Sequence, residues 1–161
     1  MKTLILIRHA KSSWDDPSLN DFDRPLNKRG KRDLPKMAAR FTSKYAEAKC
    51  FISSPANRAL ATAKAFAEGR ENQLILDNDL YHASYQNMLS IARHVSDNID
   101  MAAIIGHNPG LTDFCNHLLR DKRIDNMPTT GLVVLSLPIT HWKELTSKTA
   151  ALLEFDYPKK T

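Results

Sequence analysis

The sequence predicts an α/β domain with a mostly parallel central sheet. Along the 161 residues, short apolar runs of strand length alternate with segments whose apolar residues recur at helical spacing. Hydrophobic residues make up 42% of the chain and charged residues 25%, which is typical of a globular protein with a buried core. Since no repeat or low-complexity linker divides the chain, we expect a single domain over residues 1–161.

The first half of the chain begins with a strand pattern at residues 3–7, followed by a helical pattern at residues 27–46. Pro35 lies inside the helical segment, so the helix is either kinked there or begins late. The apolar run at residues 50–52 predicts a second strand.

Helix-start signals define the next two helices. Ser54 followed by Pro55 predicts an N-cap and a first helical position. Residues 74–76 predict a short third strand, and Ser84 can cap the helix that follows it.

The last third of the chain predicts three more strands. Residues 101–105 form the fourth, and a helix follows the sequence Gly-His-Asn-Pro-Gly directly after it. Residues 132–137 and 150–155 predict a final antiparallel pair around a turn near Trp142.

Charge and cysteine content narrow the function class. The chain has 23 Lys plus Arg against 18 Asp plus Glu, and this net charge of +5 favours an anionic partner without choosing one. Cys50 and Cys115 have neither metal-ligand nor CxxC spacing, which predicts a reducing, cytoplasmic location. The apolar run at residues 4–7 is too short for a signal peptide or a membrane span, so no membrane contact is expected.

Basic residues and histidines follow three of the predicted strands. Arg8 and His9 end the first, Arg58 lies one turn beyond two serines that end the second, and His107 ends the fourth. Ligands bind beyond the carboxyl ends of parallel strands, so these side chains are expected to converge. Two arginines and two histidines together predict a pocket for a phosphoryl group.

Histidine at such a pocket adds a nucleophile. A neutral imidazole at His9 can form a covalent phosphoryl intermediate, while Arg8, Arg58 and a protonated His107 supply positive charge. This chemistry needs no metal and no cofactor, and we expect none. The chain lacks a P-loop, and neither cysteine has the arginine spacing of a cysteine phosphatase.

Two charged stretches predict solvated surface. The acidic residues at positions 15, 16, 21 and 23 lack the calcium-loop pattern with its central glycine. The basic run at residues 28–32 has no interleaved aromatic residues to stack bases, so no nucleic-acid binding is expected.

Four segments together resemble a known family. They read LILIRHAKSSW at residues 4–14, RPLNKRG at 24–30, SSPANRALATA at 53–63 and IIGHNPGL at 104–111. The chain is similar to the histidine phosphatase (phosphoglycerate mutase-like) superfamily and, within it, to short phosphohistidine phosphatases of the SixA type. That resemblance implies a three-layer α/β/α sandwich with a phosphoglycerate mutase-like fold.

The resemblance also implies roles for individual residues. His9 matches the family nucleophile, Arg8 and Arg58 match the phosphate-binding arginines, and His107 matches the second histidine that binds the phosphoryl group. Arg24 falls where SixA-like proteins carry a further basic residue near the pocket. The alternative for Arg24 is a surface ion pair with a neighbouring aspartate.

The sequence departs from the family pattern at two positions. Ala10 stands where most members have glycine, and His82 stands where many have a general-acid glutamate. An alkoxide leaving group depends on such an acid far more than a phosphorylated imidazole does. The departure therefore favours phosphohistidine substrates, with His82 as a possible but dispensable acid.

We therefore expect a metal-independent phosphatase that acts through a phosphohistidine intermediate. Its expected substrate is phosphohistidine on a protein such as a histidine phosphotransfer domain. The alternatives are a phosphatase of small phosphomonoesters and a non-catalytic module that binds phosphate or nucleic acid. The sequence leaves the oligomeric state open and slightly favours a monomer.

Overall fold

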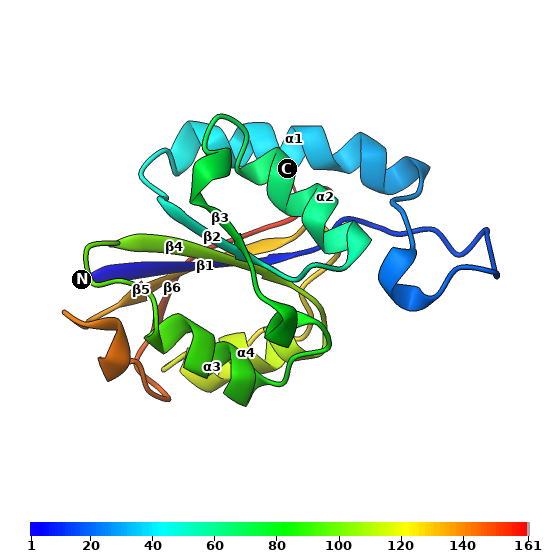
Figure 1. Cartoon of the computed structure of the whole chain (residues 1–161). Helices are drawn as coiled ribbons and strands as arrows, with labels where there is room; N and C mark the ends of the chain where they lie inside the picture. The colour runs from blue at the N-terminus through cyan, green and yellow to red at the C-terminus, as the bar shows by residue number, and fades with distance from the viewer. Residues whose placement is uncertain (161) are drawn as a thin grey trace.

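A computed structural model describes residues 1–160, which form one six-stranded sheet between two pairs of helices (Figure 1). The strands are β1 (Lys2–Arg8), β2 (Cys50–Ser53), β3 (Leu74–Leu76), β4 (Met101–Gly106), β5 (Leu132–Leu137) and β6 (Ala151–Asp156). Their order is β3-β2-β4-β1-β5-β6. The pairing is parallel from β3 to β1, and antiparallel between β1 and β5 and between β5 and β6. The predicted three-layer α/β/α architecture is confirmed.

The central strand β1 is apolar on both faces because helices cover both sides of the sheet. Leu4 and Leu6 pack with the core on one side, and Ile5 and Ile7 pack with the core on the other. All four side chains are fully buried, as the continuous apolar run predicts.

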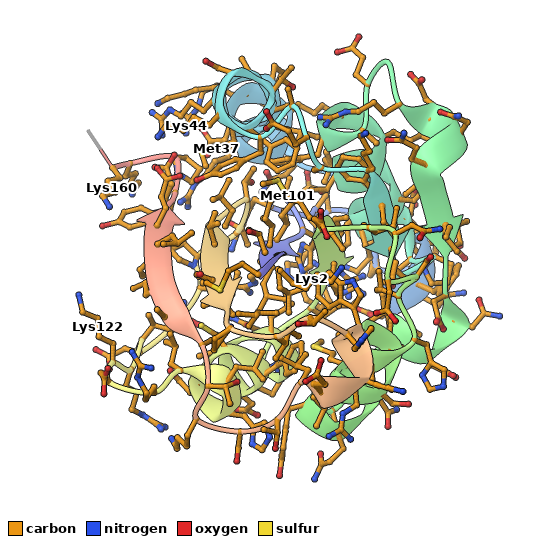
Figure 2. The ribbon with its side chains drawn as sticks, turned by 90° about the vertical axis from the view of Figure 1, so that its left-hand side faces the viewer. Lys2, Met37, Lys44, Met101, Lys122 and Lys160 are labelled. Atoms are coloured by element: carbon orange, nitrogen blue, oxygen red, sulfur yellow. The ribbon has the colours of Figure 1, made fainter. Side chains whose placement is uncertain are left out.

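The helices form two layers. They are α1 (Lys28–Lys44) and α2 (Asn57–Phe66) on one face, and α3 (Tyr85–Arg93) and α4 (Gly110–Leu118) on the other (Figure 1). Figure 2 shows Met37 between α1 and the sheet, whereas Lys44 at the end of the same helix points outward.

Helix α1 does not begin late at Pro35. It starts at Lys28, because the Asn27 side chain accepts a hydrogen bond from the Gly30 amide and caps the first turn. Pro35 and Lys31 are both exposed. The Lys31 carbonyl that Pro35 leaves without its helical partner therefore lies on the solvent side, where the proline is tolerated.

The predicted start of the second helix is wrong. Ser54 is not its N-cap: α2 begins at Asn57, with Ala56 at the N-cap position. The Ser54 amide still donates to the Ile105 carbonyl at 3.0 Å, so its backbone continues the sheet ladder. The other cap is confirmed, since the Ser84 side chain accepts from the Asn87 amide at the start of α3.

The closing strands pair antiparallel, as predicted, and a short 3-10 helix at Trp142–Glu144 lies between them. Cys50 and Cys115 are buried, free core residues. Within the described chain, none of the helices combines the length and the apolar character that a membrane crossing requires.

Candidate active site

Three neighbouring strands bring the predicted residues to one edge of the sheet. β2, β4 and β1 are adjacent, and they lead into Ser54, His107 and His9 respectively. The rings of His9 and His107 lie 5.2 Å apart, centroid to centroid. The expected convergence at the carboxyl ends of the strands is therefore observed.

The backbone around His9 fixes the state of its ring. His9 Nδ1 lies 2.8 Å from the carbonyl oxygen of Ala10, which can only accept, so Nδ1 carries the hydrogen and Nε2 keeps its lone pair. The Ala10 amide in turn donates to the Thr62 hydroxyl at 2.9 Å. His9 itself is buried, with 7% of its surface exposed.

Buried donors without partners gather around this ring. Among residues 1–160, four buried side-chain polar atoms lack a hydrogen-bond partner, and three of them are Arg8 Nε, Arg58 Nε and His107 Nδ1. Native proteins satisfy nearly all buried polar groups, so three such nitrogens in one cluster indicate a site built for an acceptor-rich group.

The arginines are oriented by contacts on their other nitrogens. Arg8 Nη1 donates to the Met127 carbonyl at 2.9 Å. Arg58 donates from Nη1 to the Asp21 carbonyl at 2.7 Å and from Nη2 to the Asp21 carboxylate at 3.0 Å. Each guanidinium is therefore held at one end while its Nε remains available.

Asp21 is the residue that the sequence analysis missed. It was expected in a solvated acidic loop, yet its carboxylate accepts from Arg24 at 2.9 Å, from Arg58 at 3.0 Å and from the Tyr81 hydroxyl at 2.7 Å. Burial alone would raise the pKa of Asp21, but these hydrogen bonds outweigh it and hold the pKa well below its usual range. Asp21 is therefore an ionised carboxylate that holds Arg24, Arg58 and Tyr81 together.

Arg24 is paired with Asp21, but it is not on the surface. It is buried, and its remaining nitrogens donate to the Ser13 carbonyl at 3.0 Å and the Ser12 hydroxyl at 2.6 Å. The Trp14 ring lies 3.2 Å from its guanidinium carbon. With every nitrogen engaged, Arg24 is better placed to orient Asp21 than to bind a ligand directly.

His82 lies at the rim of the site. Its Nε2 is 3.5 Å from the Asp21 carboxylate, and its ring centroid is 6.0 Å from that of His107. A hollow of about 290 Å³ beside the two rings is lined by residues 82–84 and 107–110 together with Asp113. Gly110 permits this approach, because a Cβ there would lie 2.1 Å from the Ala83 carbonyl oxygen.

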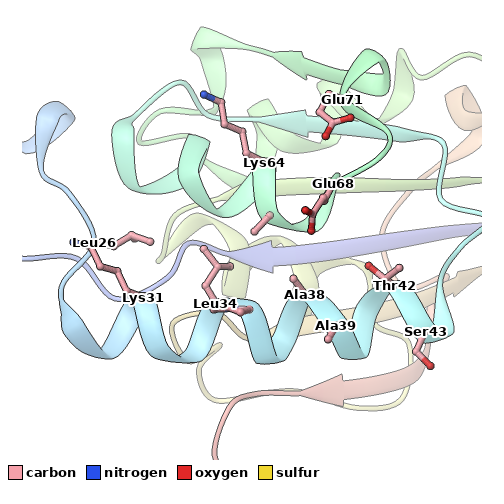
Figure 3. A pocket seen from close by; sticks show the side chains of 12 residues that line it. Leu26, Lys31, Leu34, Ala38, Ala39, Thr42, Ser43, Lys64, Glu68 and Glu71 are labelled. Carbon is pink, nitrogen blue, oxygen red and sulfur yellow. The ribbon is translucent and has the colours of Figure 1, made fainter.

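A larger hollow of about 960 Å³ lies elsewhere, between α1 and α2 (Figure 3). Its lining includes Leu34, Ala38, Lys64 and Glu68, and none of the strand-end histidines or arginines. Among residues 1–160, no three His, Cys, Asp or Glu side chains are grouped so that they could hold a metal ion.

Burial and positive neighbours keep both site histidines neutral. Burial, together with Arg58, Arg8 and Arg24, lowers the pKa of His9 from 6.5 to about 4. Burial, His9 and Arg58 lower the pKa of His107 from 6.5 to about 3. The positive charge that the sequence analysis gave His107 is therefore not expected in the ligand-free protein at neutral pH.

These shifts predict acid destabilisation. Both pKa values are depressed on folding, so the unfolded chain binds more protons and stability falls as the pH drops from 6.5 towards 4. His9 alone should contribute a loss on the order of 3 kcal/mol across that window. Urea unfolding at pH 7, 6 and 5 measures the slope, and His9→Gln should reduce it; equal stability of the wild type at pH 7 and 5 would contradict the prediction.

Comparison with known proteins identifies the family. Residues 4–99, more than half of the chain, match the histidine phosphatase superfamily (branch 1). The chain belongs to this superfamily. Membership supports a phosphatase activity, and the matched region contains Arg8, His9, Arg58 and His82.

Sequence relatives and solved structures show which proteins this histidine phosphatase is similar to. A chloroplastic protein of Arabidopsis thaliana is 31% identical over 121 residues, or 68% of this chain, and the chain spans 55% of that protein's length. A candidate phosphohistidine phosphatase SixA of Nakamurella multipartitia has a TM-score of 0.86 at 22% identity, covering 99% of this chain and 97% of that one. A protein histidine phosphatase SixA complexed with tungstate has a TM-score of 0.81 at 15% identity, covering 97% of each chain. The predicted SixA-type, phosphoglycerate mutase-like fold is confirmed.

Proposed function

We propose that this histidine phosphatase hydrolyses phosphohistidine on a protein through a phosphoryl intermediate on His9. The observation that carries the proposal is the set of three unpartnered buried donors, Arg8 Nε, Arg58 Nε and His107 Nδ1, beside the free Nε2 lone pair of His9. A phosphoryl group offers three acceptor oxygens to three such donors. Tungstate, a tetrahedral oxyanion, is bound by one of the structurally similar SixA proteins, which is consistent with such a site.

The first chemical step transfers the phosphoryl group. The His9 Nε2 lone pair attacks phosphorus and the P–N bond to the substrate imidazole breaks. That imidazole leaves as the neutral ring, with the electron pair on the freed nitrogen and the hydrogen that it already carries on its other ring nitrogen. The arginines stabilise charge on the equatorial oxygens. Ser54 Oγ lies 2.8 Å from His107 Nε2 and already accepts a hydrogen bond from the Ala56 amide at 3.2 Å. We therefore assign the hydroxyl hydrogen of Ser54 to His107 Nε2, which leaves the hydrogen of His107 on Nδ1, where it can donate to the phosphoryl group.

The second step releases phosphate. Water attacks phosphorus, and the P–Nε2 bond of His9 breaks and returns its electron pair to the ring. Dihydrogen phosphate leaves with the oxygen and both protons of the water. The Ala10 carbonyl holds the same tautomer throughout, so the nucleophile is ready for the next cycle. Apart from the substrate and the attacking water, both steps use only groups of this chain, and neither step requires a metal ion.

The lack of a strong acid favours phosphohistidine over phosphoesters. Asp21 cannot donate a proton at neutral pH because its pKa is far below the usual range. His82 and Asp113 are the two other titratable side chains that line the hollow beside His107. A phosphorylated imidazole leaves without much assistance, whereas an alkoxide does not.

A chelator-treated panel of substrates tests the proposal. The protein, incubated with EDTA, should dephosphorylate a phosphohistidine protein and free phosphohistidine with much higher kcat/KM than phosphoserine or a sugar phosphate. Preference for a phosphomonoester would instead support the small-molecule alternative. Absence of all turnover, with phosphate or DNA still bound, would support a non-catalytic module.

His82 should be dispensable for the proposed substrate. His82 has a φ of 55°, a left-handed conformation that asparagine also tolerates, so His82→Asn removes the titratable group without backbone strain. We expect less than about a tenfold fall in kcat for phosphohistidine, below the usual contribution of a general acid. A fall of about a thousandfold or more, measured by phosphate release, would show that His82 is an essential acid.

A further inference from the structure

Exposed apolar side chains gather on the segment that connects β1 to α1. Among residues 1–160, seven large apolar side chains are exposed, and three of them are Trp14, Leu19 and Phe22. Trp14 is 74% exposed, and Leu19 and Phe22 are each 37% exposed. Figure 1 shows this segment, residues 12–24, projecting beyond the edge of the sheet where β1 ends.

The segment is held in a defined shape. The Ser13 amide donates to the Pro25 carbonyl at 2.8 Å, and the Asn20 side chain accepts from the Asp23 amide at 3.1 Å. Asn57, at the start of α2, donates to the Asp23 carbonyl at 3.1 Å. The exposed side chains are therefore presented on an ordered surface, which lowers the entropic cost of binding.

The same segment borders the active site. It supplies Asp21 and Arg24, which together with Arg58 form the ionic cluster beside the histidines. Phe22 lies edge-on to Tyr81 at 5.2 Å between ring centroids, and Trp14 covers the guanidinium of Arg24. A macromolecule that delivers a phosphoryl group to His9 must therefore approach next to these side chains.

The charge of the segment differs from that of the whole chain. The chain has a net charge of +5, yet Asp15, Asp16 and Asp23 are exposed on the segment. Within the part of the chain that the structure describes, none of these three carboxylates forms an ion pair with a basic side chain. The segment beside the phosphoryl pocket thus presents apolar side chains and unpaired carboxylates, which complement an apolar surface flanked by lysine or arginine.

We propose that residues 12–24 form the docking surface for the phosphorylated protein, and that this partner carries its phosphohistidine beside apolar and basic side chains. The inference rests on the proposed function and adds to it the surface that selects the partner. A small phosphorylated molecule fills only the pocket and gains nothing from the segment, whereas a protein substrate gains apolar burial and charge pairing there.

Two variants that leave the ionic cluster untouched test this surface. Leu19→Ser removes an exposed apolar side chain, and Asp15→Lys reverses an unpaired charge. Leu153→Ser is the matched control. Leu153 is also an exposed apolar residue, at 61%, but it lies on the edge strand β6, outside the segment and two positions from β1 in the strand order. For each, kcat/KM is measured with a phosphohistidine protein that has a basic, apolar surface and with free phosphohistidine.

We expect Leu19→Ser and Asp15→Lys each to lower kcat/KM for the phosphoprotein by about fivefold to tenfold, mainly through KM. Turnover of free phosphohistidine should stay within twofold, roughly, and Leu153→Ser should change neither value. Equal losses on both substrates, or none on the phosphoprotein, would overturn the docking surface. So would a change of oligomeric state in Leu19→Ser, which would make the segment an interface between copies of this chain.

Failure of the docking surface is distinguishable from failure of the proposed function. If the wild-type protein hydrolyses neither phosphohistidine substrate, the function is wrong and the docking proposal falls with it. If the wild type hydrolyses both and the variants show no selective loss, the function stands and only the docking surface is wrong.

Discussion

Replacing His9 by alanine should abolish phosphatase activity, with kcat/KM falling by about 10⁴-fold or more. The proposed reaction passes through a covalent bond to His9 Nε2, and no other ring in the cluster has a lone pair fixed by a backbone carbonyl in this way. Rapid acid-free quenching of the wild type with a labelled substrate should trap an acid-labile, alkali-stable phosphoryl adduct. The His9→Ala protein should form none.

Two controls separate loss of the nucleophile from loss of the fold. His9→Ala should keep the circular dichroism spectrum of the wild type at pH 7, and added imidazole should restore part of the turnover by accepting the phosphoryl group. His94→Ala, an exposed histidine at the end of α3, should leave kcat/KM unchanged. An acid-labile adduct that persists in His9→Ala would refute the assignment of the nucleophile.

Replacing Arg58 by alanine should lower kcat/KM by about 10³-fold, the magnitude expected when an arginine that stabilises a transferring phosphoryl group is removed. The effect has two parts. The variant loses the unpartnered Nε donor, and it leaves the Asp21 carboxylate without one of its two guanidinium partners. The loss should appear in phosphate release for every substrate that the wild type accepts.

A double-mutant cycle with Asp21→Asn isolates the second part. Asp21→Asn alone should cost about tenfold to a hundredfold, because Arg58 then loses the carboxylate that orients it. Combining the two substitutions should cost little more than Arg58→Ala alone. Strictly additive losses would show that Asp21 does not act through Arg58.

An ion pair outside the site provides the matched control. Arg40 on α1 pairs with Asp156 at the end of β6 at 3.1 Å, and neither side chain is hydrogen-bonded to the histidines or arginines of the site. Arg40→Ala should therefore leave kcat/KM unchanged while costing stability on the order of 1–3 kcal/mol, because the buried Asp156 carboxylate loses its charged partner.

Local sequence patterns predicted the elements that depend on local physics. The apolar run that forms β1 is buried on both faces by helices. A central strand of a parallel sheet needs apolar residues on both faces, so a continuous apolar run predicts one. The positions of His9 and His107 at strand ends were sufficient to predict their convergence, because parallel neighbours end at the same edge.

Tertiary contacts decided the parts that were missed. Asp21 looks like its acidic neighbours in the sequence, and only the folded chain brings it against Arg58, 37 positions away, and Tyr81, 60 positions away. The spacing of Asp21 and Arg24, three positions apart, was the one available signal. Ser54 followed by Pro55 has the local pattern of a helix cap. Its side chain instead contacts the His107 ring, which is 53 positions away and therefore invisible to a local pattern.

The place of β1 in the sheet ties catalysis to global folding. β1 is paired with β4 and with β5 along six residues on each side, and His9 follows it directly. A strand bonded on both edges exchanges its amide hydrogens only when the whole sheet opens. The residue proposed as the nucleophile is therefore anchored in the slowest-exchanging part of the chain, and activity should disappear together with the last native structure rather than before it.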